Sequence, residues 1–226
     1  MKVVWLGQAG LLIEIAGKSI IIDPYLSNSV ERINPKNARR LPIDDSFFSV
    51  TPNFIVLTHN HLDHTDPETL ERYLTVGGSI TVLAPSTAWS EVRKLGGEHN
   101  YVCFERHSEW SEGGIRFISA RAEHSDPRAI GVIIEAEGKR LYITGDTLYN
   151  SEVLDDVCSL GKIDVVFLPI NGVGNNMNML DATRFCENLA PKLAVPMHFG
   201  LFDDIRGEDW QYEPKSVPRI YEQIII

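Results

Sequence analysis

The chain has 226 residues, of which 43% are hydrophobic and 23% charged, and its formal net charge is −10 at pH 7. These values suit one globular domain over residues 1–226 and argue against a disordered or fibrous chain. An acidic surface repels a phosphate backbone, so nucleic acid is not an expected partner, and the apolar runs are too short to span a membrane.

The first half of the chain predicts short strands followed by alternating strands and helices. Runs rich in β-branched residues, separated by glycine turns, predict strands at Val3–Leu6, Leu11–Ile15 and Ser19–Ile22. Residues 27–50 lose this regularity and predict a long connection, of a kind that is either a functional loop or disordered. After it we expect a strand at 54–58, a helix that begins at Asp66-Pro67 and ends before Gly77, a strand at 80–84 and a helix at 86–95.

The second half predicts mainly antiparallel strands and then an alternating pattern. Strands are expected at 101–104, 115–122, 130–136 and 140–144, joined by glycine-bearing turns. A strand at 164–168, a helix at 181–189 and a strand at 193–197 follow. Strand-rich stretches interrupted by separate helices favour stacked sheets with helices outside. The sequence contains no linker, repeat or low-complexity segment that would mark a second domain.

The cysteines and the N-terminal segment bear on the compartment. Cys103, Cys158 and Cys186 are odd in number and far apart, so they predict neither a disulfide framework nor a thiolate metal site. We expect all three to be small packed residues in a reducing environment. The opening MKVVWLGQAG lacks the uninterrupted apolar stretch of a signal peptide. We therefore expect a cytoplasmic protein.

The densest chemical signal is the segment THNHLDH at 58–64, which follows a predicted buried strand. His59 and His61 should project to the same side at the end of that strand, and neutral imidazoles suit an ion such as Zn²⁺. Asp63 and His64 follow as the chain turns toward a helix, so the spacing favours two adjacent metals. A surface histidine cluster or an adventitious metal binder is the alternative, but packing alone gives little reason for such a cluster behind a buried strand.

The pattern His-x-His-x-Asp-His resembles the signature of the metallo-β-lactamase superfamily. Further motifs stand in the order of that family: Ile22-Asp23-Pro24, Ala122-Glu123-His124, Thr144-Gly145-Asp146-Thr147 and Pro196-Met197-His198-Phe199. The resemblance spans Val3 to about Gly200. It implies an α/β fold, a four-layer αβ/βα sandwich with two mixed β-sheets and helices on the outer faces. The stretches WLGQAGLLIE and PMHFG are similar to the L-ascorbate-6-phosphate lactonase-like branch, from whose pattern the ligand His124 departs.

The resemblance also implies a role for each motif residue. One metal would be bound by His59, His61 and His124, a second by Asp63, His64 and His198, with Asp146 bridging them. Taken alone, Asp146 could be a turn residue and His198 a buried, hydrogen-bonded histidine. His99 and His107 stand outside any such motif, and we expect both to be ordinary surface residues.

The implied mechanism uses two divalent ions, either Zn or Mn, with Fe as a further candidate. The ions would share a water, lower its pKa toward neutrality and so provide a hydroxide that attacks an electrophile. Asp63 would also orient this nucleophile and accept its proton, and Asp23 would hold the tautomer of a ligand histidine.

The substrate is the least defined part of the prediction. Lys36, Arg39 and Arg40 could contact a phosphate or carboxylate, although a solvated charge cluster is favoured because Asp44 and Asp45 stand nearby. Asn171 and Asn175 lie in a segment rich in amides and glycines, which could bind a polar substrate or simply form a loop.

We expect hydrolysis of a small polar ester, or of a sugar-type or phosphorylated lactone such as L-ascorbate 6-phosphate. Phosphodiester hydrolysis is the alternative activity, and a non-catalytic, metal-stabilised binding protein is the alternative class. The expected partners are a small-molecule substrate and further copies of the same chain.

Overall fold

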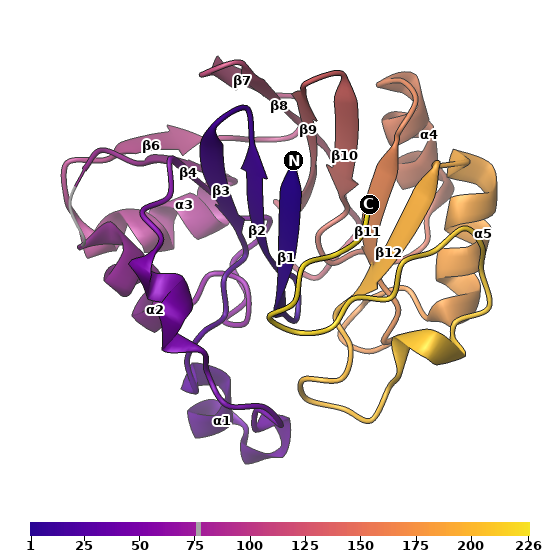
Figure 1. Ribbon diagram of the computed structural model, residues 1–226, viewed down its shortest axis with the longest axis horizontal. Coiled ribbons are helices and arrows are strands. Elements are labelled where there is room, and N and C mark those ends of the chain that lie inside the picture. The colour runs from indigo at the N-terminus through magenta and orange to yellow at the C-terminus, as the bar shows by residue number, and fades with distance from the viewer. Residues whose placement is uncertain (76–77) are drawn as a thin grey trace.

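Two six-stranded sheets lie face to face, with helices on their outer faces, in the computed structural model, which describes residues 1–75 and 78–226 (Figure 1). The first sheet follows chain order: β1 (Lys2–Gly7), β2 (Gly10–Ile15), β3 (Lys18–Ile22), β4 (Phe54–Val56), β5 (Thr81–Ala84) and β6 (Asn100–Cys103). Its strands pair antiparallel from β1 to β3 and parallel from β3 to β6. The predicted sandwich of mixed sheets is confirmed.

The second sheet is also mixed. Its strands are β7 (Glu109–Glu112), β8 (Ile115–Arg121), β9 (Ile130–Ala136), β10 (Lys139–Ile143), β11 (Val165–Pro169) and β12 (Leu193–Met197), in the spatial order β12 to β7. They pair antiparallel from β7 to β10 and parallel from β10 to β12. Because β8 and β10 are both antiparallel to β9, the strands β8, β10, β11 and β12 all point the same way.

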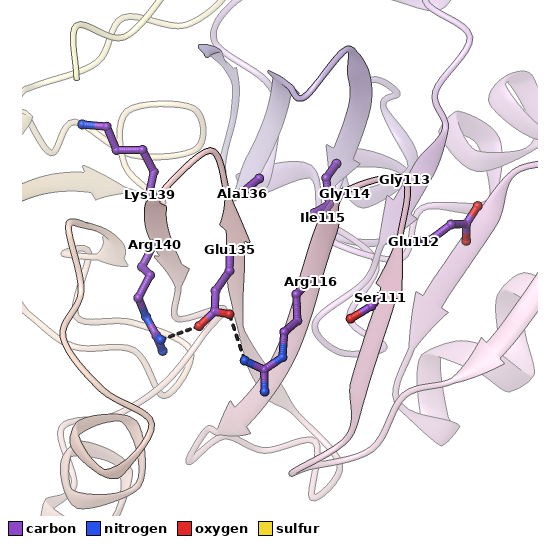
Figure 2. A pocket seen from close by; sticks show the side chains of 11 residues that line it. Ser111, Glu112, Gly113, Gly114, Ile115, Arg116, Glu135, Ala136, Lys139 and Arg140 are labelled. Atoms are coloured by element: carbon purple, nitrogen blue, oxygen red, sulfur yellow. Dashed lines mark hydrogen bonds and ion pairs between the residues drawn. The ribbon is translucent and has the colours of Figure 1, made fainter.

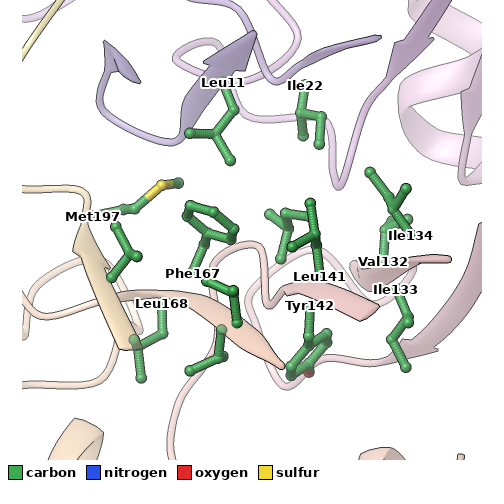
Figure 3. Packing of buried hydrophobic residues seen from close by; sticks show 14 of the residues in the cluster. Leu11, Ile22, Val132, Ile133, Ile134, Leu141, Tyr142, Phe167, Leu168 and Met197 are labelled. Atoms are coloured by element: carbon green, nitrogen blue, oxygen red, sulfur yellow. The ribbon is translucent and has the colours of Figure 1, made fainter. Parts of the chain in front are cut away.

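The core lies between the sheets. Leu11 and Ile22 of the first sheet point toward Leu141 and Phe167 of the second, and all four are fully buried (Figure 3). Removing a large aliphatic or aromatic side chain from water contributes roughly 1.5–3 kcal/mol. This apolar layer therefore supports the loops at the sheet edge.

Helices cover the outer faces of both sheets. α2 (Pro67–Leu74) and α3 (Ser86–Val92) pack on the first sheet through apolar residues such as Leu70 and Val92. α4 (Ser151–Ser159) and α5 (Met179–Leu189) lie on the second sheet (Figure 1). No helix in the described part of the chain is long and apolar enough to cross a membrane.

Most predicted elements are present, and the differences have local causes. β7 was not predicted because it is an edge strand whose sequence EWSE has no buried residue. α4 was missed although Asn150 caps it and Val153, Leu154 and Val157 form its buried face, a helical spacing that could have revealed it. The strand at 101–104 is not antiparallel, because α3 crosses over between β5 and β6 and makes them parallel.

The helix that follows the histidine cluster begins as predicted. Asp66 caps it by accepting a hydrogen bond from the backbone N–H of Thr69, and Pro67 is its first residue. Its predicted end before Gly77 lies outside the described residues, since the helix ends at Leu74 and 76–77 are not described.

Two further expectations, about the connection at 27–50 and about the cysteines, are wrong in detail. The connection at 27–50 contains the short helix α1 (Ser29–Ile33) and two 3₁₀ turns. Of the cysteines, Cys186 is buried as expected, but Cys103 and Cys158 are exposed.

Candidate metal centre

The predicted ligands lie in loops that follow strands, all at one edge of the sandwich. The segment 59–64 follows β4, His124 follows β8, Asp146 follows β10 and His198 follows β12. Because β8, β10 and β12 point the same way, their carboxyl ends meet at this edge. A hydrogen bond of 3.0 Å from the backbone N–H of His198 to the backbone oxygen of Gln8 joins the loops of the two sheets there.

His59 and His61 do not alternate along a strand, as the sequence had suggested, because β4 already ends at Val56. Both stand in the loop beyond it, and their ring centroids are 4.6 Å apart. The loop geometry therefore brings the two rings together without strand alternation.

His59, His61 and His124 form the first group. One ring nitrogen from each lies within 4.8 Å of the others, and His124 Nε2 is 3.1 Å from His61 Nδ1. Burial lowers the pKa of His59 well below its usual value, and the neighbouring ring of His64 lowers it further. His59 Nε2 is buried and has no hydrogen-bond partner among the described residues. A buried neutral imidazole with a free lone pair suits a divalent cation.

Asp63, His64 and His198 form the second group, again within 4.8 Å of one another. His64 Nε2 is 3.4 Å from His198 Nε2, and Asp63 Oδ2 is 3.4 Å from His198 Nε2. Two imidazole nitrogens and a carboxylate that converge on one point are a donor set for a divalent cation.

Asp146 stands between the two groups. Its Oδ1 is 3.4 Å from His64 Nε2, and its Oδ2 is 3.2 Å from His198 Nε2 and 3.9 Å from His124 Nε2. The structure thus brings all seven predicted ligands together, and the Asp146 carboxylate lies within 3.9 Å of ring nitrogens of both groups.

Asp23 could form a third group with His59 and His64, but its oxygens are already engaged. Oδ1 accepts from the backbone N–H of Thr58 at 2.8 Å, and Oδ2 accepts from the Thr58 hydroxyl at 2.5 Å. Oδ2 also lies 2.9 Å from His64 Nδ1. Asp23 is therefore placed to orient His64 from behind rather than to bind a cation itself.

The backbone around these groups is strained. Gln8, Asp23 and His198 have φ angles of 48°, 40° and 58°, in the left-handed region that costs non-glycine residues about 1–3 kcal/mol. Gly145, at φ 61°, precedes Asp146, and a Cβ there would lie 2.8 Å from the backbone oxygen of Ile130. Such strain is concentrated at functional sites, where the surrounding structure holds it in place.

Metal binding is expected to release protons at neutral pH. Burial opposes a charge on His198, but the carboxylates of Asp146 and Asp63 outweigh it and raise its pKa to about 10. The pKa of His64 is raised well above its usual value because the same two carboxylates outweigh its burial. Both rings therefore favour the doubly protonated imidazolium form at pH 7 in the metal-free protein. A cation must displace one of the two ring protons, so metal affinity should increase as the pH rises toward about 10.

Calorimetric titration of the metal-free protein with Zn²⁺, in two buffers of different ionisation enthalpy at pH 7, counts these protons. We expect a net release from the wild type and the same release from His107→Ala, because His107 is exposed and pairs with Asp156 outside the centre. Binding without proton release would contradict this assignment of charge.

Three amide side chains that the sequence did not single out as supports contact the ligands. Gln8 Nε2 donates to Asp63 Oδ2 at 3.0 Å, and Asn176 Nδ2 donates to Asp146 Oδ2 at 2.9 Å. The Asn171 amide lies 3.0 Å from His198 Nδ1, so this residue, expected to bind substrate, is placed to orient His198. The density of amides in 171–178 was a signal for Asn171 and Asn176, whereas nothing in the GQAG segment singles out Gln8 as a support.

Comparison with known proteins identifies the family. A family model described as "Beta-lactamase superfamily domain" matches residues 2–198. The chain belongs to this superfamily. It is 30% identical over 234 residues to a metal-dependent hydrolase of the UPF0173 group from Staphylococcus aureus, an alignment that covers 94% of this chain and 92% of that protein.

Solved structures of other proteins share the fold of this chain. A metallo hydrolase from the archaeon Ignicoccus hospitalis has a TM-score of 0.70 at 22% identity, covering 88% of this chain and 82% of its own. An isothiocyanate hydrolase from Delia radicum gut bacteria has a TM-score of 0.75 at 18% identity, covering 100% of this chain and 99% of its own.

The candidate metal centre opens into a cavity of about 490 Å³. Its described lining residues are Gln8, Asn37, His61, Asp63, Ser125, Asp146, Asn171, Val173, Gly174, Asn175, Asn176, His198, Phe202 and Asp203. The predicted Asn171 and Asn175 are among them, whereas Lys36, Arg39 and Arg40 are not. Arg39 instead donates to the backbone oxygen of Tyr25 and to the Tyr221 hydroxyl, each at 2.7 Å, and Arg40 pairs with Asp204.

A second hollow, of about 680 Å³, lies where strands β7 to β10 meet their turns. Figure 2 shows Glu135 there between Arg116 and Arg140, with which it forms ion pairs. Arg116 also pairs with Glu109, so two carboxylates face the two guanidinium groups, and the described lining residues offer no arrangement of ligands or nucleophiles comparable to the metal centre.

The two remaining histidines differ from each other. His107 is exposed, as expected. His99 is half-buried, with Nδ1 accepting from the backbone N–H of Ile80 at 3.3 Å and Nε2 lying 2.8 Å from the backbone oxygen of Leu74. His99 therefore supports the packing of the helix α2 end rather than lying free on the surface.

Proposed function

We propose that this chain is a metal-dependent hydrolase that holds two divalent ions. His59, His61 and His124 would bind one ion, Asp63, His64 and His198 the other, and Asp146 both. The observation that carries the proposal is the position of Asp146, 3.2–3.9 Å from rings of both ligand groups. His59 Nε2 supports it, because this buried atom has no hydrogen-bond partner among the described residues. Burying such an atom costs free energy unless a cation binds its lone pair.

When bound, the ions supply an activated water and Lewis acidity toward the scissile group. The chain supplies orientation and proton transfer. Asp63 lines the cavity, and the Gln8 amide at 3.0 Å fixes one of its oxygens, so its carboxylate is placed to accept a proton from the attacking water. Asp23 and Asn171 hold the rings of His64 and His198, which leaves the Nε2 atoms of both rings facing the centre.

The favoured substrate is a small polar ester or a lactone. A cavity of about 490 Å³ suits a small molecule, and its amide and hydroxyl groups can bind polar substituents. Phosphodiester hydrolysis is the alternative: the two ions could bind the non-bridging oxygens of a reacting phosphate, although the described cavity lining contains no lysine or arginine to assist them.

Metal analysis combined with a substrate screen tests the proposal. Purified protein is analysed for Zn, Mn and Fe and assayed with lactones, a chromogenic phosphodiester and an isothiocyanate, the substrate class named for the enzyme from Delia radicum gut bacteria. We expect two ions per chain and lactone turnover that a chelator removes and added metal restores. A full metal complement without turnover would favour a binding protein instead, and faster phosphodiester turnover would overturn the choice of substrate.

A further inference from the structure

The wall of the cavity beside the metal centre consists of carboxylates and uncharged side chains. Its described residues include three carboxylates, Asp63, Asp146 and Asp203, but no lysine or arginine. Asp63 and Asp146 belong to the metal centre, where cations would neutralise them. Asp203 does not: its Oδ1 accepts from the backbone N–H groups of Gly200 and Ile205, at 2.7 and 2.9 Å. Arg40 lies near enough to interact with it but is paired with Asp204, so the three groups together keep one negative charge beside the wall.

Of the cationic side chains that the sequence suggested for anion binding, Arg39 and Arg40 are engaged elsewhere, and Lys36 is exposed and does not line the cavity. The Arg39 guanidinium donates hydrogen bonds to the Tyr25 backbone oxygen and to the Tyr221 hydroxyl. It also lies over the Tyr25 ring, 5.3 Å from the ring centroid. Arg40 pairs with Asp204. An anionic substituent remote from the metals would therefore lose its hydration without gaining a cationic partner.

Two apolar side chains complete the wall. Val173 lies in the loop between β11 and α5 and is 59% exposed, although it lines the cavity. Phe202 is half-buried, with its ring edge-on to Tyr25 at 5.6 Å between centroids. Asn37, Ser125 and Asn175 supply the neutral polar groups of the same wall.

We propose that the substrate is an uncharged molecule whose apolar part lies against Val173 and Phe202, and that phosphorylated analogues are disfavoured. The proposal rests on the proposed function and narrows its substrate class. The ions attract negative charge at the reacting group itself, but a remote phosphate meets carboxylate, amide, hydroxyl and apolar groups instead. Selectivity thus comes from the wall and not from the metals.

A matched pair of lactones tests this on the metal-loaded protein. D-glucono-1,5-lactone and its 6-phosphate differ only in the remote phosphate. We expect kcat/KM for the neutral lactone to be at least about tenfold higher, because the phosphate meets the Asp203 carboxylate and finds no cationic partner in the wall. A preference for the phosphorylated lactone would overturn the inference and leave the proposed hydrolase function standing.

Charge insertion locates the selectivity in the wall. Val173→Lys should raise kcat/KM for the phosphorylated lactone about tenfold, because it supplies the missing ion-pair partner. Ile225→Lys is the matched control, since it adds the same charge at an aliphatic residue that is 85% exposed and does not line the cavity. Equal effects of the two variants would show general steering by net charge and would overturn the assignment to the wall.

Binding without turnover separates the two proposals. Calorimetry with D-glucono-1,5-lactam and its 6-phosphate, neither of which is hydrolysed like a lactone, measures the preference of the wall alone. Tighter binding of the neutral lactam supports the inference, whether or not a lactone is turned over. Absence of lactone turnover would reject only the proposed activity. Tighter binding of the phosphorylated lactam rejects the inference.

Discussion

Asp146→Ala is expected to abolish hydrolysis and to lower the metal content. Its carboxylate lies 3.2–3.9 Å from ring nitrogens of both ligand groups, so alanine removes the carboxylate that is placed to reach both cations. We expect kcat/KM to fall by at least about a hundredfold, the loss typical when a charged group that stabilises the reacting centre is removed. Elemental analysis of the purified variant should show fewer than two ions per chain.

Asp45→Ala is the matched control for this variant. Asp45 also carries an ion pair, with Arg72, but its side chain is 73% exposed and the pair lies outside the metal centre. Exposed pairs contribute about 0–1 kcal/mol, so activity and metal content should stay at the wild-type level. An Asp146→Ala protein with two ions per chain and unchanged turnover would disprove the proposed centre.

Part of this centre could be predicted from the sequence because its densest motif is local. His59, His61, Asp63 and His64 fall within six residues, so one loop after one strand holds them together. The fold could be predicted because its strands appear in the sequence as short apolar runs, which are buried on both faces of each sheet. Strand directions then explain why His198, which lies 134 residues after His64, comes within 3.4 Å of it.

Contacts made by loop amides could not be predicted in the same way. Gln8 meets Asp63 across 55 residues through a left-handed turn, and neither its residue type nor its spacing identifies a partner. The partners of Arg39 could not be predicted for a similar reason, because a guanidinium donates to a backbone oxygen such as that of Tyr25 as readily as to an anionic substrate. Side-chain partners across loops depend on the packed structure.

Asp23→Asn is expected to weaken metal binding about 10–100-fold, the usual effect of losing the partner that orients a ligand histidine. The Thr58 backbone N–H donates to Asp23 Oδ1, so an asparagine would keep its oxygen there and turn its NH₂ toward His64 Nδ1. His64 would then have to accept at Nδ1 and carry its proton on Nε2, the atom that faces Asp146. That proton occupies the lone pair a cation needs.

Competition of Zn²⁺ between the protein and a chromophoric chelator measures the affinity, and long-range ¹H–¹⁵N NMR of the ring nitrogens in the Zn²⁺-bound protein, where His64 must be neutral, reports the tautomer. Asp66→Asn is the matched control: Asp66 is equally buried and accepts from Thr69, but it is outside the three ligand groups and asparagine caps a helix as well. We expect that variant to bind Zn²⁺ like the wild type. If Asp23→Asn also kept wild-type affinity with His64 protonated on Nδ1, Asp23 would have no part in orienting the ligand.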